Sequence, residues 1–191
     1  MQNATLFILR TLFDLYVLTF AIRLVLQWAA VDRRNPLVQF ILRVTGPLVI
    51  PLRRVLPPMG RIDTATLVVL LALQLVGTFL LVRIGCVGEP ALWQILALAV
   101  SGVAKLALNV FIGAIILYVI LSWVSPGGYN PVAAVAAAIV EPVLAPFRRL
   151  IPPIGGIDLS PLFAIIALQA LSMLIPTSSI LSGMLCLALV N

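Results

Sequence analysis

Four long apolar segments alternate with connections rich in proline and arginine along the chain. The segments run from Leu6 to Ala30, from Asp63 or Thr64 to Leu81 or Val82, from about Trp93 to Val124, and from Asp158 or Ser160 to about Ile175. About 20 apolar residues in a helix cross a hydrocarbon core of about 30 Å. The pattern therefore predicts an all-α membrane protein with four transmembrane helices. The third segment is too long for one straight crossing, and we expect it to tilt or break near Ser101–Gly102.

The two halves of the chain repeat each other at a shift of 95 residues without a gap, so that Asn35 falls on Asn130 and Trp28 on Trp123. The repeated motif comprises Asn35, Pro36, Pro47, Pro57, Pro58, Gly60 and Asp63, with copies at Asn130, Pro131, Pro142, Pro152, Pro153, Gly155 and Asp158. Two crossings per repeat return the chain to its starting side, which predicts two tandem parallel repeats. We expect a single membrane domain over 1–191, with repeats at about 4–83 and 99–178 and an apolar tail at 179–191.

Each connection is predicted to contain short interfacial or re-entrant helices. Asn35 and Asn130 suit the N-cap, and the prolines that follow them suit the first helical position. A second short helix is expected to start at Pro47 and at Pro142. Leu37, Phe40, Ile41 and Val44 give the first copy an amphipathic pattern suited to an interface, whereas the second copy is apolar enough to be buried or re-entrant. For the tail we favour a kinked continuation of the fourth helix past Pro176, with an interfacial segment as the alternative.

Composition strengthens the membrane assignment. The chain of 191 residues is 63% hydrophobic and only 9% charged, with a mean hydropathy of +1.23. A soluble domain carries about 25% charged residues. The net charge of +6 is interpreted through the positive-inside rule and attraction to anionic lipid rather than to nucleic acid. The N-terminus does not resemble a cleaved signal, because Asp14 and Arg23 interrupt a stretch that is too long for one.

The distribution of basic residues predicts an orientation. The connections carry eight arginines, Arg33, Arg34, Arg43, Arg53, Arg54, Arg61, Arg148 and Arg149, and the opposite side carries three basic residues, Arg10, Arg83 and Lys105. The rule places the connections in the cytoplasm and both termini outside.

The arginine pairs Arg53-Arg54 and Arg148-Arg149 admit two interpretations. Guanidinium groups bind phosphate, which would suit anionic lipid headgroups or a charged solute, but topology and interfacial anchoring explain them as well. Asp63 and Asp158 likewise are expected to cap the following helices, with a salt bridge to the nearby arginines as the alternative.

Polar residues within the apolar segments recur at similar depth in both copies. They are Arg10, Asp14, Arg23, Gln74, Lys105, Asn109 and Gln169. A polar seam between the four helices would either hold the helices together by hydrogen bonds or line a permeation path. Packing is the favoured interpretation.

No catalytic pattern is present. The chain has no histidine, no GxSxG and no GxxxxGK[ST], and its carboxylates are too few for a metal site. We therefore expect no enzyme activity, no metal and no cofactor. Cys86 and Cys186 are expected to be small apolar residues, and a disulfide between them stays open if both face an oxidising compartment.

The segments NPLVQFILRVTGPLVIPLRRVLPPMGRID and NPVAAVAAAIVEPVLAPFRRLIPPIGGIDLSP closely resemble the repeat of the YggT family. The resemblance implies a multi-pass bacterial inner-membrane protein with relatives in plastids. It implies associations with osmotic or potassium stress tolerance, with division and envelope genes, and in plastids with cytochrome assembly and nucleoid distribution. It implies no catalytic residues, because the family has none defined. The first copy departs from the second at Gly46, where the second has Glu141, and at Arg61, where it has Gly156.

The expected function is that of a non-catalytic membrane scaffold, assembly or envelope-stress factor with arginine pairs that face anionic lipid. The alternative is an ion or small-solute channel or transport protein linked to osmotic homeostasis. Expected partners are anionic membrane lipids, and a membrane protein or a second copy of the chain. No nucleic acid is expected.

Overall fold

The computed structural model describes all residues except 1, 88–90, 125–129, 151–157, 178–184 and 187–191. The described part is all-helical apart from two short strands. Its elements in order are α1 (Gln2–Trp28), α2 (Pro36–Arg53), α3 (Thr64–Gly85), β1 (Cys86–Val87), α4 (Leu92–Val124), α5 (Pro131–Leu150), α6 (Ser160–Met173) and β2 (Leu185–Cys186). The four predicted apolar segments thus form helices close to the expected bounds.

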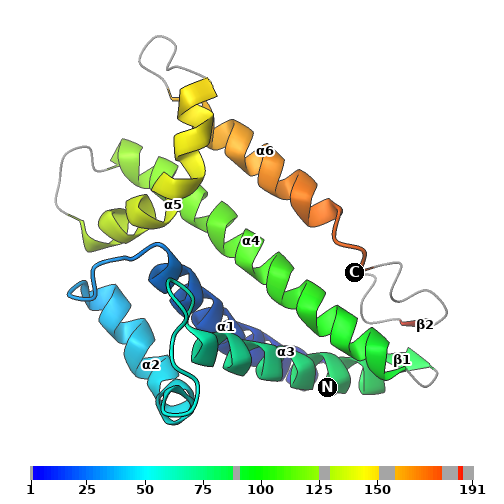
Figure 1. Ribbon diagram of the computed structural model, residues 1–191. Coiled ribbons are helices and arrows are strands. Elements are labelled where there is room, and N and C mark those ends of the chain that lie inside the picture. Colours follow the sequence, from blue (N-terminus) through cyan, green and yellow to red (C-terminus); the bar gives the residue numbers. More distant parts are fainter. Residues whose placement is uncertain (1, 88–90, 125–129, 151–157, 178–184, 187–191) are drawn as a thin grey trace.

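The long helices run between two ends of the molecule (Figure 1). At one end lie α2, α5 and the starts of α3 and α6, and at the other lie β1, β2 and the start of α4. The core between them is apolar, and its largest fully buried side chains include Phe20, Leu70, Ile115 and Leu144. Outward-facing positions are apolar as well: Phe7 is 69% exposed and Ile166 is 56% exposed. Such a surface suits lipid rather than water.

Three helices are long and apolar enough to cross a membrane: α3 over Thr64–Arg83, α4 and α5. The helix α1 has 27 residues but contains Arg10, Asp14 and Arg23, and α6 is apolar but has only 14 residues. Membrane-helix character is therefore clear in the described part of the chain.

The prolines predicted two short helices in each connection, and this prediction is wrong. Both α2 and α5 are single helices with prolines inside, at Pro47 and Pro51 and at Pro142 and Pro146. A proline within a helix removes one backbone hydrogen bond and bends the helix, but the remaining bonds can continue beyond it. Figure 1 shows this bend in the middle of α5.

The predicted break near Ser101–Gly102 is also wrong, because α4 is continuous from Leu92 to Val124. Gly102 serves packing instead. A Cβ atom at Gly102 would lie 2.3 Å from the side-chain Nε2 of Gln74. The glycine therefore allows α3 and α4 to approach with the Gln74 side chain between them.

Thr177, directly after Pro176, is again helical, as a kinked continuation requires, and the rest of that predicted continuation, at 178–184, lies outside the described residues. The helix α6 ends at Met173, and β2 pairs antiparallel with β1, with Cys186 opposite Cys86 and Leu185 opposite Val87. This pairing joins residues far apart in the sequence, so local hydrophobic patterning could not reveal it.

Candidate functional site

Arg53 and Asp63 form an ion pair at the end of the molecule that holds α2. The Nε of Arg53 donates to Oδ1 of Asp63 at 3.3 Å, and its Nη2 donates to Oδ2. Asp63 is fully buried and also accepts a hydrogen bond from Oγ1 of Thr66 at 2.6 Å. The salt-bridge alternative for Asp63 is therefore confirmed, and this pair joins the end of α2 to the start of α3.

A second arginine, Arg23 of α1, approaches the same carboxylate. Arg23 is only 3% exposed, and its Nε lies 3.8 Å from Oδ2 of Asp63 without a hydrogen-bond partner in the described structure. Its Nη1 donates to Oγ1 of Thr45 at 2.7 Å. We call Arg23, Arg53 and Asp63 the first cluster. It ties α1, α2 and α3 together and holds two cations around one anion.

The equivalent positions of the second copy also form an ion-pair cluster. Nε of Arg148 donates to Oδ2 of Asp158 at 2.9 Å, and its Nη1 donates to Oε2 of Glu141 at 2.8 Å. The hydroxyl of Tyr118, at the position of Arg23, accepts from Nη2 of Arg148 at 3.4 Å. We call Glu141, Arg148 and Asp158 the second cluster. It holds one cation and two anions.

Asp158 forms the predicted salt bridge, and its Oδ1 also accepts from the backbone N–H of Ser160, but the N-cap residue of α6 is Leu159 rather than Asp158. Burial by itself would raise the pKa of Asp63, but hydrogen bonds from Arg53 and Thr66 outweigh it and hold that pKa below its usual value. For Asp158 burial likewise opposes ionisation, and the bonds from Ser160 and Arg148 lower its pKa. Both carboxylates are therefore ionised at neutral pH.

The predicted N-caps are confirmed. Oδ1 of Asn35 accepts from the N–H of Leu37, and Oδ1 of Asn130 accepts from that of Val132, both at 2.9 Å. Asn35 does more than its copy: its Nδ2 donates to the carbonyl of Pro131 at 2.8 Å. This bond links the start of α2 to the start of α5 and so connects the two halves.

The Gly60 of the motif forms a tight turn. Met59 and Ile62 exchange two backbone hydrogen bonds across it, and Gly60 has a φ of +61° that favours glycine. Thr64 then donates to the carbonyl of Pro57 at 2.7 Å, which fixes the proline pair against the start of α3. Pro152, Pro153 and Gly155 lie outside the described residues.

Comparison with known proteins now decides the family. The model of the CCB3/YggT family matches residues 2–84 and 97–179 of this chain. The chain belongs to the CCB3/YggT family. The two matches lie 95 residues apart, as the two copies of the motif do, and both clusters fall within them.

Relatives of the CCB3/YggT chain cover nearly its whole length. An uncharacterized protein of Pseudomonas aeruginosa is 46% identical over 92% of this chain and 89% of its own length. The YggT protein of Escherichia coli K12, also uncharacterized, is 37% identical over 90% of this chain and 89% of its own. A Haemophilus influenzae protein is 29% identical over 89% and 90%. No solved structure matches.

The polar residues predicted within the apolar segments are dispersed in this CCB3/YggT protein. Arg10 and Asp14 pair with each other on an exposed face of α1, at 3.7 Å. Nζ of Lys105 donates to the hydroxyl of Thr177 at 2.6 Å. Gln74 packs at Gly102, and the exposed Gln169 and Asn109 lie on α6 and α4. Only Arg23 joins an ion-pair cluster.

Asn109 borders an apolar pocket of about 500 Å³ between the two halves. The pocket is lined by α1, α2, α4 and α5, including Ile22, Val38, Phe40, Ala114 and Ile139. The predicted apolar face of α2 thus partly lines this pocket, through Leu37, Phe40 and Ile41. The arrangement can accept a hydrocarbon chain. No group of three or more acidic, histidine or cysteine residues able to hold a metal lies among the described residues.

Sequence reasoning did not assign roles to Thr45, Thr66, Tyr118 and Glu141, although all four contact the clusters. The signal was present in the two copies. At the clusters the aligned halves differ in charge at two positions, Gly46 against Glu141 and Arg23 against Tyr118.

Proposed function

We propose that the chain is a non-catalytic inner-membrane scaffold whose arginine-bearing cytoplasmic end holds anionic lipid. In this proposal α1, α3, α4 and α6 are four spans arranged as two parallel repeats. The bent helices α2 and α5 cover the cytoplasmic end, and both termini lie outside. The bound lipid anchors the scaffold in the membrane, and the scaffold assembles with a membrane-protein partner.

The charges of α1 are compatible with a span because each has a counter-ion. Arg10 pairs with Asp14, and Arg23 lies beside the buried Asp63. Intramembrane charges are tolerated where they are paired. The bends within α5, together with Glu141, Arg148 and Arg149, argue against a straight crossing by that helix.

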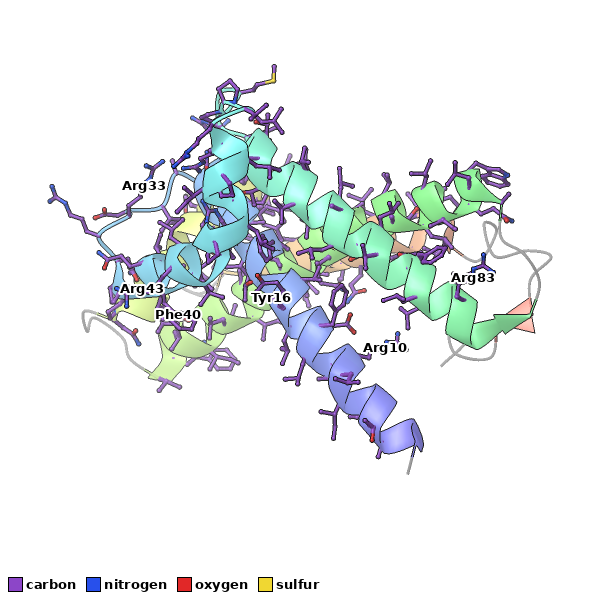
Figure 2. The ribbon with its side chains drawn as sticks, turned by 90° about the horizontal axis from the view of Figure 1, so that it is seen from below. Arg10, Tyr16, Arg33, Phe40, Arg43 and Arg83 are labelled. Carbon is purple, nitrogen blue, oxygen red and sulfur yellow. The ribbon has the colours of Figure 1, made fainter. Side chains whose placement is uncertain are left out.

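The positive-inside rule supports the orientation. Figure 2 shows Arg33 and Arg43 at the end of the molecule that holds α2, and Arg83 at the far end of α3. Basic residues concentrate on the cytoplasmic side of membrane proteins.

The observation that carries the lipid proposal is that only one arginine of each adjacent pair forms an ion pair within the protein. Arg53 and Arg148 are engaged with Asp63 and Asp158. Arg54 and Arg149 are exposed, and neither has a side-chain partner in the described structure. An exposed guanidinium at a membrane interface is suited to bind a phosphate headgroup through two N–H donors.

The pocket between the halves supports the same proposal. Its lining is apolar except for Asn109, and Phe40, one helical turn from Arg43, contributes to it. Both residues lie near each other in Figure 2. An acyl chain fits this lining, whereas an ion would lose its hydration without replacement ligands.

Native mass spectrometry of the purified chain with phosphatidylglycerol tests the proposal. Arg54→Gln/Arg149→Gln should lose retained anionic lipid, whereas Arg10→Gln/Arg83→Gln, which removes the same charge at the other end, should keep it. Equal adducts in the two variants would contradict the lipid assignment.

Ion flux separates the scaffold from the alternative of a permeation protein. Liposomes under a potassium gradient should show no flux above empty liposomes. Flux that changes in Asp14→Asn/Asn109→Ala would instead favour a permeation path and count against the scaffold.

A further inference from the structure

The two cysteines of the chain come together at the end of the molecule opposite the arginines. Cys86 lies in β1, directly after α3, and Cys186 lies in β2. They are direct partners in the antiparallel pairing of these strands. Figure 1 shows this strand pair at the end away from α2 and α5. No other cysteine exists in the sequence, so each has one intramolecular candidate partner.

The backbone register satisfies the geometric requirement for a disulfide. Directly opposed residues of an antiparallel pair have Cα atoms about 4.5 or 5.5 Å apart, depending on the hydrogen-bonding pattern. Both values lie within the range of about 4.4–6.8 Å that disulfides span.

The location supplies the chemical environment. The orientation proposed above places this strand pair outside the cytoplasm, where envelope compartments are oxidising and disulfides persist. A two-residue strand pair is marginal without further support. A covalent bond there would hold β2 against β1, directly after α3.

We infer that Cys86 and Cys186 form an intramolecular disulfide on the extracytoplasmic side, which fastens the C-terminal tail of the second half to the end of α3 in the first. This inference rests on the orientation in the proposed function.

The oxidant is the disulfide of a thiol–disulfide oxidoreductase. The thiolate of one cysteine attacks it, forms a mixed disulfide and releases one thiolate of the oxidant. The second cysteine, after losing its proton, attacks the mixed disulfide and releases the other thiolate. The protein loses two protons and two electrons, and the oxidant becomes a dithiol.

Thiol counting tests the inference on full-length protein in membranes prepared without reductant. The protein is denatured and treated with polyethylene-glycol maleimide, with or without prior reduction. The wild type should take no adduct before reduction and two after it. Cys86→Ser and Cys186→Ser should each take one adduct in both conditions. Two adducts on the unreduced wild type, or a disulfide-linked dimer on a non-reducing gel, would overturn the inference.

The same variants separate this inference from the orientation on which it rests. A membrane-impermeant maleimide is applied to intact inner-membrane vesicles of right-side-out orientation carrying Cys86→Ser. Labelling of Cys186 together with free thiols in the wild type would refute the disulfide and leave the orientation standing. Protection of Cys186 until the membrane is dissolved would refute the orientation and the inference with it.

Discussion

The first and second clusters occupy equivalent positions in the two halves but differ in the sign of their excess charge, which is positive in the first and negative in the second. In the first, Arg23 and Arg53 surround a fully buried Asp63. In the second, Arg148 lies between Glu141 and an Asp158 side chain that is 36% exposed. The arginine–aspartate pair is common to both, and the surplus charge is not.

The common arginine–aspartate pair indicates a structural role shared by both copies, whereas the differences in burial and surplus charge indicate roles specific to each copy. Each pair joins the end of a bent helix to the start of the next helix, which is the shared structural role. Burial differs, and burial sets the energetic weight: exposed ion pairs contribute little, whereas removal of one partner from a buried pair is costly. The first cluster should therefore dominate stability.

Replacing the two aspartates in parallel gives the largest expected contrast. Asp63→Asn leaves two arginines without a counter-ion in a buried site and should lower the free energy of unfolding by about 3–5 kcal/mol. Asp158→Asn should cost about 1 kcal/mol or less, because solvent and Glu141 remain close to Arg148. Thermal unfolding in detergent measures both. Equal losses would show that burial does not distinguish the clusters.

Low pH should remove the stabilisation that the ionised Asp63 contributes. The folded-state pKa of Asp63 is below its ordinary value, so its stabilisation is complete above the unfolded pKa of about 3.9 and is lost as pH falls through the folded pKa. The stability difference between wild type and Asp63→Asn should thus stay constant from about pH 8 to 5 and shrink only at lower pH. Unfolding midpoints across this series provide the measurement. A difference that already shrinks near neutrality would contradict a lowered pKa.

A carboxylate transplanted from the second cluster should partly repair the first. Gly46 occupies the position of Glu141, and a Cβ there would meet only the Cδ1 of Ile50, at 3.4 Å. Gly46→Glu in the Asp63→Asn background should recover about 1.5 kcal/mol through a charge-assisted bond to an arginine. Gly46→Gln is the matched control without charge. Equal recovery by both would attribute the effect to packing rather than to charge.

The sequence predicted the helices that depend on local pattern. Apolar length located α1, α3, α4 and α6 to within a few residues, and the Asn-Pro caps located the starts of α2 and α5. The repeat identified the aspartates and arginines that pair. Context changed the rest. Pro47 and Pro142 bend helices instead of ending them, and Gly102 makes room for Gln74 instead of breaking α4. The strand pair and the burial of Arg23 depend on residues distant in sequence, which no local pattern encodes.

Asn35 and Asn130 also show that a local motif does not determine long-range contacts, because these identical motif residues have different hydrogen-bond partners. Both cap a helix, but only Asn35 also donates to the carbonyl of Pro131 in the other half. Asp serves about as well as Asn at an N-cap and suits the positive end of the helix dipole, so Asn130→Asp should leave stability nearly unchanged. Asn35→Asp keeps the cap but loses the amide donor, which should cost about 1 kcal/mol. Chemical or thermal unfolding of the two variants, which carry the same charge change, measures the difference. A loss of the same size in both would mean that the bond between the halves adds no stability, and that the halves are held together by apolar packing alone.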